Sequence, residues 1–225
     1  MTARSLLVFD LDGTLAETAG DLIGTLNVIL AREGVAPLPL AEARFMLGAG
    51  ARALIQRGLA AVGRSVTPER LEEMFRDFLV HYEGRIAQES HLFPGVEAAL
   101  DRLDAAGWVF AVCTNKMEHA SVKLLTELGA AHRFRAICGQ DTFVLCKPHK
   151  EALIGTINAS RGDIRRTIMV GDSRTDVETA RNAGVPVVAV DFGYTDRHVS
   201  EFAPDRMISH FDELWDAVDG LLARD

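Results

Sequence analysis

Hydrophobic residues follow different patterns in different parts of the chain. Near the N-terminus the uninterrupted apolar run Leu6–Phe9 is typical of a buried strand in a parallel sheet. From Thr18 to Tyr82 apolar residues recur at the three- and four-residue spacing of helices. After Pro94 helical stretches alternate with short apolar runs. The pattern predicts an α/β protein interrupted by a helical segment.

The helical segment follows the first strand directly. We expect helices over Thr18–Arg32, from Leu40 to the glycine-rich stretch 47–50, over Arg52–Val62, and from Thr67 to about Tyr82. Thr67 can cap the last of these, and Pro68 suits its first turn. Because no convincing strand is visible before Pro94, residues 16–91 are expected to form an all-helical subdomain. Residues 1–15 and 92–225 then form the α/β core.

The core repeats a strand and helix alternation. The expected strands are Trp108–Thr114, Phe134–Cys138, Thr167–Val170, Val185–Val190 and Arg206–Ile208. The expected helices are Pro94–Ala106, Glu118–Leu128, one after Lys147-Pro148, one ending at Ala183, and Phe211–Leu222. Repeated βα units predict a doubly wound parallel sheet with right-handed crossovers. Ligands bind such sheets at the carboxyl ends of the strands.

Composition excludes several classes of protein. The 225 residues are 48% hydrophobic and carry a net charge of −8, which argues against a general binder of nucleic acid or anionic membranes. A small anionic substrate stays compatible, because local charges can outweigh the net field. Neither a signal peptide nor a spanning helix is visible, so a cytoplasmic location is expected. The histidines lack ligand spacing, and Cys113, Cys138 and Cys146 are expected to be reduced.

Two carboxylates follow the first strand. Asp10 and Asp12 should project to the same side, because side chains alternate along a strand. Close carboxylates repel each other unless a cation or a shared proton compensates, and magnesium is the natural cation for such oxygens. Gly13 permits close approach to a ligand, and Thr14 can donate a hydrogen bond. The alternative is a polar cap on a buried strand.

Other strand ends carry residues suited to phosphoryl chemistry. Thr114-Asn115 follows the second strong strand, and Gly171-Asp172-Ser173-Arg174-Thr175-Asp176 follows another, with Lys147 between them. Each alone has a plain explanation as a helix cap, a turn or a solvated lysine. Because the motifs occur together, in this order and at these positions, the plain explanations would require a series of coincidences.

The ordered set resembles the four motifs of the haloacid dehalogenase superfamily, mostly phosphatases, over essentially the whole chain. The resemblance implies that Asp10 is the nucleophile that forms an aspartyl-phosphate and that Asp12 is the acid/base. It implies Mg²⁺ held by Asp10, the backbone carbonyl of Asp12 and Asp172. Asp176 would orient a metal water or Lys147, with Gly171 and Ser173 in support.

The same resemblance assigns substrate contacts. Thr114, the Asn115 backbone N–H and Lys147 should bind the nonreacting phosphoryl oxygens. The helical insertion falls where the family has its C1 cap, a lid that carries specificity. Arg52 in this cap is a candidate for the distal anion of the substrate; the alternative is a solvated helix arginine.

Within the superfamily the resemblance is closest to bacterial phosphoglycolate phosphatases. It rests on GAGARALIQRGL, LFPGVEAALDRLDAAGW, AVCTNK and MVGDSRTDVETARNAGVPVVAVDFGYTD. That group usually shows KPxP, whereas this chain has Lys147-Pro148-His149-Lys150, which keeps the lysine and alters the loop. The implied substrate is 2-phosphoglycolate, hydrolysed to glycolate and phosphate.

Alternative functions differ in the residues that they need. The substrate could be another small sugar phosphate, a nucleotide or pyrophosphate, and the enzyme a monomer or a homodimer. A β-phosphoglucomutase-like transferase usually carries Val at the position of Thr14. A dehalogenase has no need of Asp12 or magnesium. A protein that only binds phosphoryl ligands would be expected to lose at least one member of the set.

Overall fold

A six-stranded parallel sheet forms the centre of the computed structural model, which describes residues 4–195 and 197–222. The strand order is β5-β4-β1-β6-β7-β8. The strands are β1 (Leu6–Phe9), β4 (Val109–Cys113), β5 (Phe134–Cys138), β6 (Thr167–Gly171), β7 (Val187–Val190) and β8 (Arg206–Ile208). Leu6 of β1 pairs with Val109 of β4 on one side and with Thr167 of β6 on the other. These three strands therefore end side by side, as the doubly wound prediction requires.

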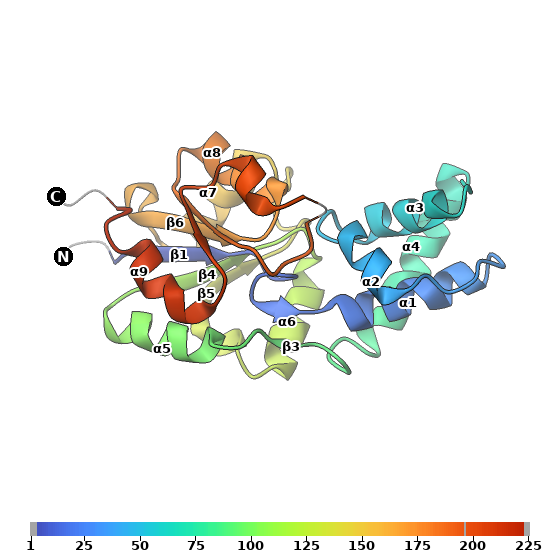
Figure 1. Ribbon diagram of the computed structural model, residues 1–225, viewed down its shortest axis with the longest axis horizontal. Coiled ribbons are helices and arrows are strands. Elements are labelled where there is room, and N and C mark those ends of the chain that lie inside the picture. Colours follow the sequence, from blue (N-terminus) through green and yellow to red (C-terminus); the bar gives the residue numbers. More distant parts are fainter. Residues whose placement is uncertain (1–3, 196, 223–225) are drawn as a thin grey trace.

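Helices cover both faces of this sheet because β1 is apolar on both faces (Figure 1). Leu7 and Phe9 belong to the hydrophobic cluster that includes residues of α5 (Val96–Ala105), α6 (Glu118–Glu127) and α9 (Leu214–Val218). Leu6 and Val8 point to the opposite face and join residues of α7 (Lys150–Ala159) and α8 (Arg174–Ala183). Burial on both sides accounts for the continuous apolar run.

The helical segment forms a separate group beyond the carboxyl end of β1 (Figure 1). It contains α1 (Ala19–Ala31), α2 (Leu40–Ala43), α3 (Ala51–Ala61) and α4 (Pro68–Glu83). Thr67 caps α4 as expected, since its side chain accepts a hydrogen bond from Arg70 N. Leu26 and Leu30 of α1 and Phe78 of α4 are buried and belong to one cluster. Apolar faces of the helices thus hold the cap together.

The expectation of no strand between β1 and Pro94 was wrong. Two-residue strands, β2 (Ala16–Glu17) and β3 (His91–Leu92), pair antiparallel where the chain enters and leaves the cap. Two residues are too few to produce a readable alternation, so hydrophobic patterning missed them. The proposed domain boundaries fall at this strand pair and stay a prediction.

The expected C-terminal helix Phe211–Leu222 is also wrong in extent. The chain forms a 3₁₀ turn at Phe211–Glu213 followed by the short α9, and Gly220 has a left-handed φ of 75°. The remaining 3₁₀ helices are Arg44–Met46, Ala131–Arg133, Ile164–Arg166 and Val199–Phe202. No helix within the described part of the chain is long and apolar enough to cross a bilayer.

Asp21, near the start of α1 where the chain enters the cap, is hydrogen-bonded to residues 89 and 90, where the chain leaves it. Its buried Oδ2 accepts hydrogen bonds from Glu89 N (3.0 Å), Ser90 N (2.9 Å) and Ser90 Oγ (2.7 Å). Asp21→Ala would remove the acceptor of the buried Ser90 N–H and of the part-buried Glu89 N–H, so we expect the free energy of unfolding to fall by about 1–3 kcal/mol. Ser90→Ala removes one side-chain donor only and should cost less. Denaturant unfolding of both variants is the measurement, and an unchanged Asp21→Ala midpoint would contradict this assignment.

Candidate active site

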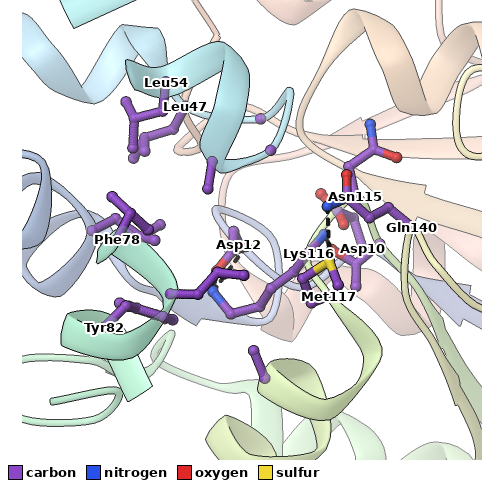
Figure 2. Close-up of a pocket in the computed structure, with 17 residues that line it drawn as sticks. Asp10, Asp12, Leu47, Leu54, Phe78, Tyr82, Asn115, Lys116, Met117 and Gln140 are labelled. Atoms are coloured by element: carbon purple, nitrogen blue, oxygen red, sulfur yellow. Dashed lines mark hydrogen bonds and ion pairs between the residues drawn. The ribbon is translucent and has the colours of Figure 1, made fainter. Parts of the chain in front are cut away.

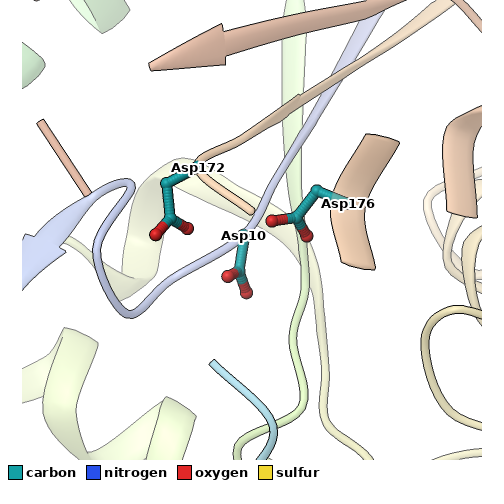
Figure 3. A group of neighbouring side chains, drawn as sticks. All are labelled: Asp10, Asp172 and Asp176. Carbon is teal, nitrogen blue, oxygen red and sulfur yellow. The ribbon is translucent and has the colours of Figure 1, made fainter. Parts of the chain in front are cut away.

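Three buried carboxylates from separate elements meet at the ends of β1 and β6 (Figure 3). One oxygen each from Asp10, Asp172 and Asp176 lie within 4.8 Å of one another. Asp10 directly follows β1, Asp172 follows β6, and Asp176 lies in the first turn of α8. Oxygen donors of this kind suit a hard divalent cation.

Lys147 lies inside this acidic cluster. Its buried Nζ is 2.9 Å from Asp10 Oδ1 and 2.6 Å from Asp176 Oδ1. One ammonium offsets only one of three carboxylate charges, and burial of the excess charge is costly without a further cation. Within the described residues, Asp10 Oδ1 accepts no hydrogen bond despite this ion pair. The donor set therefore fits a bound metal ion.

The pKa shifts of these carboxylates also favour a bound cation. Burial raises the pKa of Asp10 to about 6, where attraction by Lys147 opposes the rise and repulsion by Asp176 and Asp12 adds to it. Burial, followed by repulsion from Asp176 and Asp10, also raises the pKa of Asp172. A divalent cation would restore the ionised form of these carboxylates.

Asp172 is held by two loops. Thr14 Oγ1 donates to Asp172 Oδ1 at 3.0 Å, and the backbone N–H of Tyr194 donates to Oδ2 at 2.7 Å. Gly13 has φ of 86°, and a Cβ there would lie 2.6 Å from Asp172 Oδ2. A Cβ at Gly193 would lie 2.2 Å from the Cβ of Asp172. Only glycine permits this approach at either position.

Asp176 has two partners. Its Oδ2 accepts hydrogen bonds from the Ser173 backbone N–H (3.1 Å) and hydroxyl (2.6 Å), so the pair begins α8 with a capping box. Its Oδ1 accepts a hydrogen bond from Lys147. A Cβ at Gly171 would lie 2.3 Å from the Cβ of Asp176. Asp176 is therefore positioned to orient Lys147.

Asp12 lies apart from the cluster, on the cap side. Its Oδ1 accepts hydrogen bonds from Thr18 Oγ1 at 2.8 Å and from Lys116 Nζ at 3.0 Å. Lys116 is itself buried; desolvation lowers its pKa, but attraction to the Asp12 carboxylate helps to outweigh this, so its pKa is raised. Asp12 thus faces a buried cation where the cap meets the core.

Thr114 and Asn115 follow β4 and are both buried. Thr114 Oγ1 accepts a hydrogen bond from Lys116 N at 3.2 Å. Asn115 Nδ2 donates to the Lys147 backbone carbonyl at 3.2 Å, which joins this strand end to the lysine loop. The structure brings both residues beside Asp10.

A cavity of about 50 Å³ opens between core and cap (Figure 2). Its core side is polar and includes Asp10, Asp12, Thr114, Asn115 and Lys116. Its cap side is mainly apolar and includes Leu22, Leu47, Leu54, Phe78 and Tyr82. A small ligand with an anionic end suits this division.

Arg52, the expected contact for a distal anion, does not line this cavity. Its guanidinium donates to both carboxylate oxygens of Glu72, at 2.9 and 3.0 Å, and lies 3.7 Å from the ring centroid of Phe75. Lys116 and Tyr194 are brought to the site instead, and sequence reasoning missed both. Two sequence features could have indicated them: Lys116 directly follows Thr114-Asn115, and Gly193-Tyr194 lies just beyond the apolar strand Val187–Val190.

Comparisons with known proteins agree with this geometry. Residues 7–190 match the family described as haloacid dehalogenase-like hydrolase. The chain is 48% identical over 212 residues to a phosphoglycolate phosphatase of Mesorhizobium japonicum, covering 94% of this chain and 93% of that one. It is 44% identical over 205 residues to a phosphoglycolate phosphatase of Caulobacter vibrioides, covering 91% and 86%.

A solved structure extends the likeness to three dimensions. The crystal structure of a predicted phosphoglycolate phosphatase from Haemophilus somnus matches with a TM-score of 0.88 and 28% identity, covering 96% of this chain and 98% of that one. The chain belongs to the haloacid dehalogenase-like hydrolase family. It is an enzyme of the phosphatase class, and its relatives carry the name phosphoglycolate phosphatase. The expected family and fold class are confirmed.

The glycine contact with Asp172 gives a direct test of metal binding. Gly193→Ala should lower the affinity for a divalent cation about 10- to 100-fold, because the added Cβ must displace a carboxylate of the cluster. Gly24→Ala is the matched control, since a Cβ at this exposed position of α1 meets no atom within 4 Å. Isothermal titration with Mg²⁺ or Mn²⁺ measures the effect. Equal affinities in the two variants would contradict the assignment.

Proposed function

We propose that the protein is a magnesium-dependent phosphomonoesterase that hydrolyses 2-phosphoglycolate to glycolate and phosphate. The observation that carries the proposal is the buried Asp10 carboxylate paired with Lys147, with Asp12 on the same cavity. The names of the relatives support the substrate, and the small volume of the cavity favours a small ester. We expect it to act in the cytoplasm, as a monomer or a homodimer.

The first step forms a covalent intermediate on Asp10. A carboxylate oxygen of Asp10 attacks phosphorus, the bond from phosphorus to the ester oxygen breaks, and that oxygen takes a proton from Asp12. Lys147, Thr114 and the Asn115 backbone N–H hold the nonreacting oxygens. Lys147 is already held by Asp176, so it enters the reaction oriented.

The second step returns the enzyme to its starting state. A water molecule attacks phosphorus and gives a proton to Asp12, which is ionised after the first step. The bond between phosphorus and the Asp10 oxygen breaks, and phosphate leaves. One ester and one water are consumed for each alcohol and each phosphate released.

Magnesium would be held by Asp10, Asp172 and the backbone carbonyl of Asp12. When bound, it neutralises charge between the anionic nucleophile and the anionic phosphoryl group. The bonds from Thr14 and Tyr194 keep Asp172 turned toward this position.

Loss of the nucleophile should abolish turnover. Asp10→Asn is expected to lower phosphate release from 2-phosphoglycolate with magnesium by about a thousandfold or more, and excess chelator should do the same to the unaltered enzyme. Asp216→Asn is the control, because Asp216 is exposed on α9. Metal-dependent turnover that survives Asp10→Asn would refute the mechanism. An isomerised product without phosphate release would indicate a mutase.

A further inference from the structure

Lys116 occupies the junction of core and cap. It lies just beyond β4, and its side chain is only 6% exposed. Its Nζ is 3.0 and 3.3 Å from the two oxygens of Asp12 and 4.5 Å from the centroid of the Tyr82 ring (Figure 2). The ammonium therefore sits between a core carboxylate and a cap aromatic ring.

The cavity needs a second positive charge if its ligand has two anionic ends. Lys147 lies at the phosphoryl end, within the carboxylate cluster. Among the described residues that line the cavity, Lys116 is the sole cation. Neither Arg52 nor Arg44 of the cap lines the cavity, and each is paired with a carboxylate, Arg52 with Glu72 and Arg44 with Glu17. A distal carboxylate inside the cavity thus has Lys116 as its available charged partner.

Tyr82 adds a second donor to the same place. Its side chain is 2% exposed and lines the cavity, and its hydroxyl has no hydrogen-bond partner among the described residues. Burial raises the pKa of Tyr82 to about 12, so the hydroxyl stays protonated and can donate. A buried donor without a partner is costly, and a ligand oxygen would satisfy it.

The resting contact of Lys116 conflicts with the role proposed for Asp12. Both Asp12 oxygens face the ammonium, and Oδ1 also accepts from Thr18. A carboxyl group that gives a proton to a leaving oxygen needs at least one oxygen turned to the substrate. Lys116 must therefore move away from Asp12 before the first step.

We propose that Lys116 and the Tyr82 hydroxyl bind the distal carboxylate of the substrate, and that this contact draws Lys116 away from Asp12. The inference rests on the proposed phosphatase function. The substrate carboxylate then has two effects: it anchors the ester and leaves Asp12 available for proton transfer. Esters without a second anion bind with Asp12 still paired to Lys116, so they react slowly.

The test compares 2-phosphoglycolate with ethyl phosphate, which has a methyl group in place of the carboxylate. The ratio of the two kcat/KM values should fall about 10- to 100-fold in Lys116→Met, as expected for loss of a charge-assisted hydrogen bond. Tyr82→Phe should lower the ratio about 3- to 10-fold. Lys116→Arg keeps the charge and should retain most of the preference. Lys150→Met, at an exposed position, is the matched control and should leave the ratio unchanged.

Several outcomes would overturn the inference. An equal loss on both esters in Lys116→Met, with thermal unfolding unchanged, would assign Lys116 to catalysis in general. If the ratio falls in Arg52→Met but not in Lys116→Met, Arg52 and not Lys116 binds the substrate carboxylate. If Lys116→Met fails to fold, the other two variants decide. The inference is refuted if the ratio of kcat/KM values is unchanged in Tyr82→Phe and lost in Lys116→Arg. Wild-type enzyme that hydrolyses 2-phosphoglycolate with a ratio unchanged by Lys116→Met and Tyr82→Phe refutes the inference alone. Hydrolysis of other esters but not of 2-phosphoglycolate refutes the proposed substrate as well, and no hydrolysis of any ester refutes the phosphatase mechanism.

Discussion

The main constraint on this structure is the burial of three neighbouring carboxylates in one site. Asp10, Asp172 and Asp176 are all buried within 4.8 Å of one another, and Lys147 offsets only part of their charge. Such a cluster is stable only if the surrounding chain holds each group and a cation completes the charge balance. Burial raises the pKa of Asp10, because desolvation disfavours its ionised form.

The fold meets this constraint because the carboxyl ends of neighbouring strands bring the site residues together. β1 lies between β4 and β6, so Asp10, Thr114 and Asp172, which follow these strands, meet at their carboxyl ends. Glycines at 13, 171 and 193 let backbone segments come so close to the carboxylates that a Cβ would collide with them. The cap closes the other side of the cavity with mainly apolar residues and contributes Tyr82. In our proposal the core supplies the reacting groups, and Lys116 of the core and Tyr82 of the cap together recognise the substrate.

Much of this arrangement could be predicted from the sequence, because long apolar runs and strand-end motifs are local signals. The six core strands and the cap helices lie close to their expected ranges, and Asp10, Lys147, Asp172 and Asp176 meet at one site. The two-residue strands β2 and β3 could not be predicted, because they are too short to show periodicity. The direction of a side chain is equally hidden in sequence: Arg52 turns to Glu72, and Lys116 reaches Asp12 across 104 positions of the chain.

The central claim, that Asp10 carries the phosphoryl group, can be tested by rapid quenching. Enzyme, magnesium and 2-phosphoglycolate are mixed and acid-quenched at successive times within the first turnover, and peptides are then analysed by mass spectrometry. The account predicts a phosphorylated peptide containing Asp10 that appears before phosphate is released and decays at a rate no slower than turnover. Phosphate released at the full rate with no phosphorylated Asp10 at any time, or with the phosphoryl group on another residue, would contradict it.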